Sequence, residues 1–155
     1  MRRPPLVYLD TNVFIRGIEG NVTEAAPVQR LLNLLRDFPE ASITSELTLA
    51  ELPAPTGRVG TLPLSIKEPL YLDLIVSGNF IVLHPVARDI LILTAEIRSK
   101  FPQKLPDAIH IATASQAGCK YFMSHDRNGK RLPLTLHHVF PDEKGVDAVI
   151  DVLRG

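Results

Sequence analysis

The sequence predicts an α/β fold, in which a mainly parallel sheet of four to five strands forms the middle of a three-layer α/β/α sandwich. Two observations lead to this prediction. Short apolar segments alternate with longer segments in which apolar residues recur at helical spacing, as in chains built from βα repeats. The short segments are also apolar almost throughout, which is typical of strands that are buried on both faces of a parallel sheet.

The predicted elements follow one another closely along the chain. Strands are predicted over residues 6–9, 41–44, 80–83 and 121–124, with a fifth strand over 135–139 at an edge. Helices are predicted over residues 11–19, 22–37, 46–52, 65–77, 86–100, 106–117 and 145–153. Residues at helix ends support several of these boundaries: Ser45 can cap one helix, Pro106 suits a first turn, and Gly118 suits a helix end.

The composition favours an ordinary globular domain without a membrane segment. A chain of 155 residues fits a single domain, 1–155. Basic and acidic residues, 17 of each, give a formal net charge of zero, so any nucleic-acid contact must come from a local patch. The lone Cys119 excludes an intramolecular disulfide and suits the cytoplasm. The apolar run at 6–9 is too short for a signal peptide, and no run is long enough to span a bilayer.

Acidic residues lie where the predicted strands end. Asp10 follows the first strand directly, and Asp126 lies two residues beyond the fourth. Asp107 falls in the first turn of the helix at 106–117, and Glu51 in the helix after the second strand. Ligands of open parallel sheets bind beyond the carboxyl ends of the strands, so we expect these four carboxylates to face one crevice.

Carboxylates that converge in this way favour a divalent cation. Without one, they repel one another and raise each other's pKa. Oxygen ligands select hard ions such as Mg²⁺ or Mn²⁺, which can activate water and neutralise charge in a phosphoryl transition state. The sequence therefore predicts a metal site that could cleave a phosphodiester, although acids at loop ends are common in any α/β domain.

Four short segments give this hypothesis more specificity. In order and in combination, LDTNVF (9–14), LTLAEL (47–52), LPDAIHIATA (105–114) and SHD (124–126) resemble the motifs of the PIN-domain ribonuclease family. The resemblance extends from residue 6 to about 126 and is closest to the toxin-like virulence-associated protein C group. It implies an endoribonuclease that depends on Mg²⁺ or Mn²⁺, a homodimer, and a small antitoxin protein as partner in a type II toxin–antitoxin pair.

The resemblance also implies roles for individual residues. The matches to the family's metal-binding acids are Asp10, Glu51, Asp107 and Asp126. Asn12 and Ser124 match the polar residues that accompany the first and last acids. Two features depart from the family pattern: His125 stands where Asn or Asp is frequent, and the loop 53–63 matches no motif.

Other roles remain open for several residues. Asp10 and Asp107 could simply stabilise helix starts. His110 shares a helix face with Asp107 and could orient it or touch substrate, although a partly buried histidine with local hydrogen bonds is favoured. Basic side chains follow the last acid and form either an RNA-phosphate contact or a solvated loop: Arg127, Lys130 and Arg131.

Two rival functions belong to other classes. The first is a module of the same fold that binds RNA or a protein without cutting it, which the four acids argue against. The second is a phosphatase of the haloacid-dehalogenase type with Asp10 as nucleophile. That family needs a second Asp two residues later, where this chain has Asn12.

Overall fold

The computed structural model describes residues 3–52, 62–126 and 132–155. In these residues a five-stranded sheet has the order β3-β2-β1-β4-β5, and every neighbouring pair is parallel. The strands are β1 (Val7–Leu9), β2 (Ser42–Ser45), β3 (Ile81–His84), β4 (Tyr121–Met123) and β5 (His137–Val139). The predicted parallel sheet and its edge strand are therefore confirmed, with β1 in the centre.

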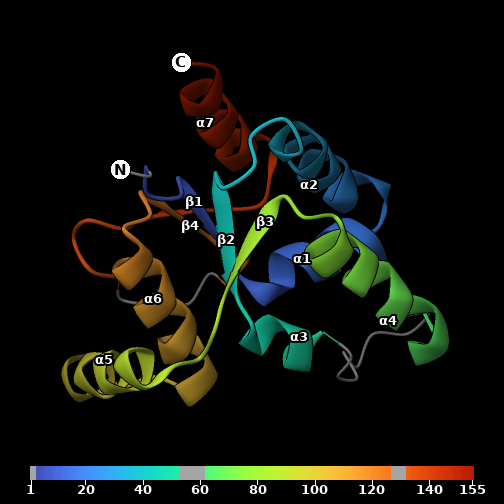
Figure 1. Cartoon of the computed structure of the whole chain (residues 1–155). Coiled ribbons are helices and arrows are strands. Elements are labelled where there is room, and N and C mark those ends of the chain that lie inside the picture. Colours follow the sequence, from blue (N-terminus) through green and yellow to red (C-terminus); the bar gives the residue numbers. More distant parts are fainter. Residues whose placement is uncertain (1–2, 53–61, 127–131) are drawn as a thin grey trace.

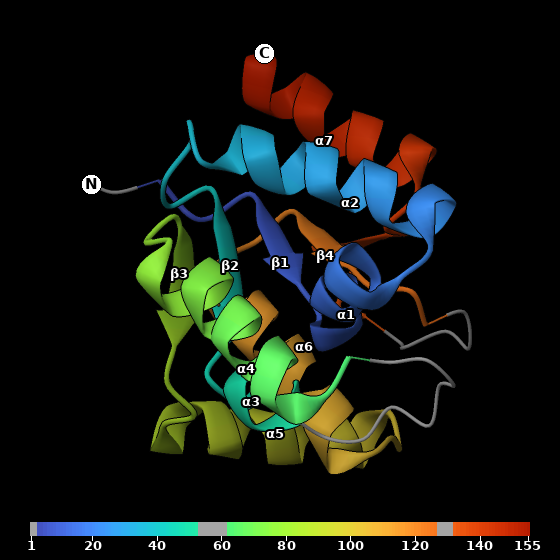
Figure 2. The ribbon, with the colours of Figure 1, turned by 90° about the vertical axis from the view of Figure 1, so that its right-hand side faces the viewer.

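Helices cover both faces of the sheet (Figures 1 and 2). One face carries α1 (Thr11–Glu19), α2 (Val22–Leu35), α4 (Leu64–Leu72) and α7 (Glu143–Arg154), and the other carries α5 (Arg88–Lys100) and α6 (Leu105–Ala117). The short helix α3 (Leu47–Glu51) continues from the end of β2. This arrangement is the three-layer α/β/α sandwich that the sequence predicts.

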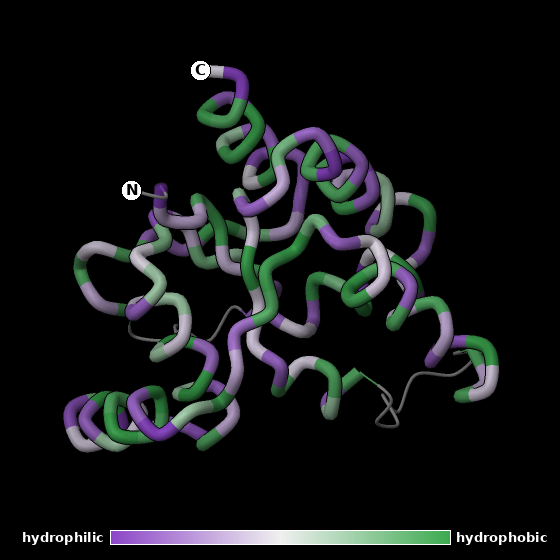
Figure 3. Tube along the Cα trace, viewed as in Figure 1, coloured by the Kyte–Doolittle hydropathy of each residue, from purple (hydrophilic) through white to green (hydrophobic). Residues whose placement is uncertain are grey.

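Side chains of β1 alternate between the two cores. Val7 and Leu9 pack among residues of α1, α2 and α7, whereas Tyr8 packs among residues of α5 and α6. All three are fully buried, because parallel strands between two helix layers have no solvent-facing side. In Figure 3, which is coloured by hydropathy, most of β3 is hydrophobic.

Helix boundaries agree with the capping signals in the sequence. Asn21 and Glu24 form a reciprocal capping box at the start of α2. Gly118 ends α6 with a φ of 78°, a left-handed conformation that glycine adopts without strain. The segment predicted as one helix over 65–77 is divided: α4 ends at Leu72, and a π-helical turn, Asp73–Ser77, follows.

Two further observations concern membrane-spanning helices and the cysteine. Among the described residues, no helix is long and apolar enough to cross a membrane. Cys119 is buried, and its burial raises the pKa of the thiol to about 12.

Candidate active site at the carboxyl edge of the sheet

Asp10 lies at the centre of the carboxyl edge, between the end of β1 and the start of α1. It is the N-cap residue of α1, and its Oδ1 accepts a hydrogen bond from Thr11 N at 2.9 Å. Its Oδ2 accepts one from Ser124 Oγ at 2.8 Å. The side chain is nearly buried, at 4% exposure. Capping and site roles are therefore compatible in this residue.

Asn12 and Ser124 join the end of β4 to the start of α1. Asn12 Nδ2 donates to Ser124 Oγ at 3.2 Å, and Asn12 Oδ1 accepts from His125 N at 2.9 Å. The backbone N–H of Asp126 in turn donates to Ser124 Oγ at 3.2 Å. These contacts hold the backbone of the half-buried Asp126 near Asp10 through the shared partner Ser124, as the paired ends of the adjacent strands β1 and β4 allow.

Glu51 reaches the same edge from α3. Its Oε1 accepts hydrogen bonds from Thr11 Oγ1 at 2.8 Å and from His110 Nε2 at 2.5 Å. His110 Nε2 also lies 3.7 Å from Asp10 Oδ1. Two carboxylates from different elements therefore approach one nitrogen.

The surroundings of Glu51 favour its ionised form. Burial acts to raise its pKa, but the hydrogen bond from His110, supported by Thr11, holds the pKa below the ordinary value. The converging acids of the sequence predict a cation beside Glu51. In the structure, the buried side chain of His110 hydrogen-bonds to the Glu51 carboxylate. The partners of His110 come from β1, α1 and α3 rather than from its own helix, so the expected local bonding is replaced by tertiary contacts.

Asp107 lies in the first turn of α6, three residues before His110, and is half-buried. The other end of α6, at Gly118, lines a cavity beside the residues that precede β1 and β4, so Asp107 lies toward the carboxyl edge. The carboxylates of the four acids nevertheless do not converge on a single position. In the part of the chain that the structure describes, no three His, Cys, Asp or Glu side chains form a group that could hold a metal ion.

The donor chemistry still fits a hard divalent cation. Carboxylate oxygens are the ligands that such ions prefer, and Asp10 and Glu51 meet at His110 Nε2. A complete ligand set would require Asp107 and Asp126 to move toward them.

Two further sequence predictions concern residues beyond this network. Arg127, Lys130 and Arg131, and nearly all of the loop 53–63, lie outside the described residues. His125 Nδ1 is 3.2 Å from Arg16 Nη1, which also pairs with Glu24 at 3.3 Å. A hollow of about 270 Å³ opens next to Arg16 and His125, with Phe140 on its wall.

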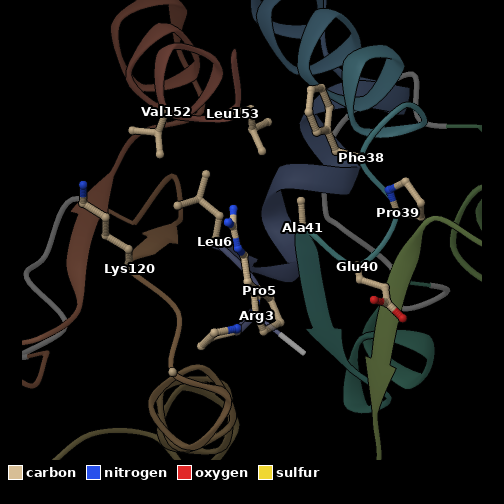
Figure 4. Close-up of a pocket in the computed structure, with 12 residues that line it drawn as sticks. Arg3, Pro5, Leu6, Phe38, Pro39, Glu40, Ala41, Lys120, Val152 and Leu153 are labelled. Atoms are coloured by element: carbon tan, nitrogen blue, oxygen red, sulfur yellow. The ribbon is translucent and has the colours of Figure 1, made fainter. Parts of the chain in front are cut away.

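A larger cavity lies at the opposite edge of the sheet. It measures about 560 Å³ and is lined by residues that precede β1, β2 and β4, including Leu6, Ala41 and Lys120 (Figure 4). The cavity holds one carboxylate, Glu40, and none of the four acids. The arrangement of the acids, rather than cavity size, therefore identifies the candidate site.

Sequence reasoning missed three polar residues that organise the site. Tyr8, Thr11 and Thr48 are buried and hydrogen-bonded to site residues or to each other. The sequence pattern indicates only that Tyr8 belongs to an apolar strand and that Thr11 lies between Asp10 and Asn12. A hydroxyl in a fully buried strand is the signal that could have identified Tyr8, because such a group needs a partner.

Comparisons with known proteins agree with the fold. The family model described as "PIN domain" matches residues 7–133. A toxin–antitoxin complex from Klebsiella pneumoniae is 19% identical, with 88% of this chain and 98% of that chain covered at a TM-score of 0.62. DNA-bound VapBC from Salmonella typhimurium is 18% identical, with the same coverage and a TM-score of 0.63.

A third solved structure is VapC20 of Mycobacterium tuberculosis, described as a sarcin–ricin loop cleaving toxin. The two sequences are 16% identical, the matched region covers 79% of this chain and 91% of the VapC20 chain, and the TM-score is 0.59. At such identities these likenesses show the fold. Comparison with curated protein sequences gave no match.

Proposed function

The chain belongs to the PIN-domain family, and from this membership and the site we propose that it is a divalent-metal-dependent endoribonuclease. The observation that carries the proposal is the approach of Asp10 Oδ1 and Glu51 Oε1 to a single point, at 3.7 and 2.5 Å from His110 Nε2. We propose Asp10, Glu51, Asp107 and Asp126 as the ligands of Mg²⁺ or Mn²⁺. When bound, such an ion supplies positive charge for the phosphoryl group and activates water.

The protein's own residues would prepare this site. Ser124 and Asn12 hold Asp10 in one orientation, and Thr11 and His110 hold Glu51. Fixing carboxylates in this way lowers the reorganisation needed when substrate arrives. Because no described side chain is placed as an evident nucleophile, we propose that water attacks the phosphorus. The bond from phosphorus to the 3′-oxygen breaks, and this oxygen leaves as a hydroxyl after taking up the proton that the water loses.

RNA cleavage with and without EDTA tests the proposal directly. The purified chain, freed of any inhibitor protein, should cut RNA with Mn²⁺ or Mg²⁺ and stop when EDTA is added. A folded chain that cuts no RNA in either metal would instead support the module that binds without cutting.

Metal binding is expected to stabilise the fold. Carboxylates that repel one another in the metal-free protein gain an ion that the unfolded chain binds weakly, so millimolar Mn²⁺ should raise the melting temperature by linkage. Thermal melting with Mn²⁺ and with EDTA measures the effect. The Asp10→Asn variant is the control, and an equal rise in that variant would place the ion elsewhere.

We propose that RNA follows the basic residues after Asp126. Arg127, Lys130 and Arg131 would contact phosphates, and Phe140, which is 38% exposed beside the hollow at Arg16, offers a ring on which a base could stack. Replacing the three basic residues by alanine should weaken RNA binding and flatten its salt dependence. The measurement is the slope of log Kd against log salt, and an unchanged slope would mean a solvated loop without a role in binding.

A protein partner is the last part of the proposal. Two of the structures compared above are toxin–antitoxin complexes, and we propose a small antitoxin and a homodimer for this chain, acting in the cytoplasm. Exposed apolar side chains on α4 and on the π-helical turn after it support a partner: Leu64, Ile66, Leu70, Leu72 and Val76 are 42–51% exposed. Tyr71 and Ile75, in the same two elements, are buried in the core.

A further inference from the structure

A buried chain of hydrogen bonds leads from β2 through β1 and α6 to Glu51. Ser45 N donates to Tyr8 Oη at 3.1 Å, and Tyr8 Oη lies 2.5 Å from His110 Nδ1. On the other side of the ring, His110 Nε2 lies 2.5 Å from Glu51 Oε1. Tyr8 and His110 are at most 1% exposed, so water does not compete for these contacts.

The directions of these hydrogen bonds follow from counting protons. Ser45 N can only donate, so Tyr8 Oη accepts there and has its own proton to place. Among the described residues, His110 Nδ1, at 2.5 Å, lies at hydrogen-bond distance to accept that proton. A tyrosine hydroxyl with an ordinary pKa of about 10 carries its proton at neutral pH, so it has a proton to donate.

The other ring nitrogen must therefore carry the hydrogen. Glu51 Oε1 is a carboxylate oxygen and can only accept, so at 2.5 Å Nε2 has to be the donor. An imidazole that accepts at Nδ1 and donates at Nε2 is the neutral Nε2–H tautomer. A ring protonated on both nitrogens would bring two N–H donors, Ser45 N and His110 Nδ1, onto Tyr8 Oη, and the Tyr8 proton would have to leave the 2.5 Å contact.

We infer that Tyr8 and His110 are positioning residues, in which the Tyr8 hydroxyl selects the Nε2–H tautomer of His110 and this N–H orients Glu51 toward the cation. The hydrogen bonds that His110 and Thr11 donate to Glu51 are both accepted by Oε1. The arrangement directs the carboxylate so that its second oxygen can bind the ion. The role of Glu51 rests on the proposed function, whereas the tautomer does not.

Tyr8→Phe is the sharpest test, because it removes the hydroxyl and keeps the ring. The ring stacks on Phe122 with centroids 5.2 Å apart and an interplanar angle of 5°, so the core remains filled. Two quantities are measured. Long-range ¹H–¹⁵N spectra of the metal-free protein identify which nitrogen of His110 carries hydrogen, and titration with Mn²⁺ alone gives the metal affinity.

In the wild type we expect a protonated Nε2 and a bare Nδ1, and in Tyr8→Phe a mixture of tautomers. Mn²⁺ affinity should fall by about tenfold, the lower end of the effect of losing a group that orients a metal ligand. Tyr121→Phe is the matched control: Tyr121 is half-buried in β4, near Lys120. It should leave the tautomer and the affinity unchanged.

A second pair of variants keeps the inference testable if Tyr8→Phe folds poorly. His110→Gln retains an N–H that can reach Glu51, whereas His110→Leu removes it. We expect His110→Leu to lose about 10- to 100-fold in Mn²⁺ affinity and His110→Gln to recover part of that loss. Equal affinities in the two variants would contradict the orienting role.

The inference and the proposed function fail in different ways. A wild-type ring protonated at Nδ1, or a Tyr8→Phe variant with unchanged tautomer and unchanged Mn²⁺ affinity, overturns the inference, and RNA cleavage by the wild type would still stand. A wild type that cuts no RNA contradicts the proposed function, while the spectra of the metal-free protein still decide the tautomer.

Discussion

Asp10→Asn is expected to lower metal-dependent RNA cleavage by about tenfold to a thousandfold, which corresponds to a few kcal/mol of transition-state stabilisation. The change keeps the shape of the side chain and removes a charge from the proposed ligand set. Asp107→Asn, at the start of α6, should lower cleavage in the same range. Initial cleavage rates at saturating Mn²⁺, with melting curves on the same preparations, measure both effects.

The structure also predicts what Asp10→Asn does to stability. The amide keeps an oxygen for Thr11 N but presents an N–H₂ group to Ser124 or Asn12, so a loss of about 1 kcal/mol is expected. Relief of repulsion between acids offsets part of it. Asp89→Asn is the matched control, because Asp89 Oδ1 accepts from Ile90 N at 2.9 Å, as Asp10 accepts from Thr11.

Asp89→Asn should change stability slightly and leave cleavage unchanged. If Asp10→Asn is folded and cuts RNA at the wild-type rate, the assignment of Asp10 as a metal ligand is wrong. A fall in activity that only follows the folded fraction would reduce Asp10 to a helix cap.

Glu19→Leu is expected to destabilise the fold by about 3–5 kcal/mol. Glu19 accepts a hydrogen bond from Tyr71 and lies 3.9 Å from Lys67 Nζ, with the Lys67 and Glu19 side chains 5% and 1% exposed. Burial and the hydrogen bond to Glu19 raise the pKa of Tyr71. Losing the carboxylate removes the hydrogen-bond acceptor of Tyr71 and a charged neighbour of Lys67 in the buried space between α1 and α4, where water cannot replace them.

Urea unfolding of a double-mutant cycle measures this coupling. Lys67→Met should cost less than Glu19→Leu, and the double variant should be more stable than Glu19→Leu alone. Arg30→Met is the control, because Arg30 pairs with Asp147 at 2.6 Å at the exposed surface and should contribute about 1 kcal/mol or less. Additive losses in the cycle would show that Glu19 and Lys67 do not interact.

Much of the fold could be predicted from the sequence because its signals are local. Segments such as 80–83 are apolar throughout, and Pro106 and Gly118 mark the ends of α6 within a few residues. The parallel arrangement followed from the same pattern, since strands buried on both faces need helices between them. The π-helical turn after Leu72 could not be predicted, because no local residue signal distinguishes it from continued α-helix.

The candidate site was predictable to the extent that it follows from strand ends. Asp10 and Ser124 come directly after β1 and β4, and neighbouring parallel strands end at one edge. The partners of Glu51 were not predictable in this way. Tyr8 and His110 are 102 positions apart in the chain, and their contact depends on how α6 packs against β1. Packing of that kind is a tertiary property that periodicity does not encode.

The location of Mn²⁺ in a crystal soaked with the ion tests most directly whether these acids hold a metal. Anomalous scattering identifies the ion without reference to activity. We expect an anomalous-scattering peak within coordination distance of carboxylate oxygens of Asp10 and Glu51, with Asp107 or Asp126 moved toward it. At saturating Mn²⁺, a peak elsewhere on the molecule, or none beside Asp10, would contradict the proposed metal site.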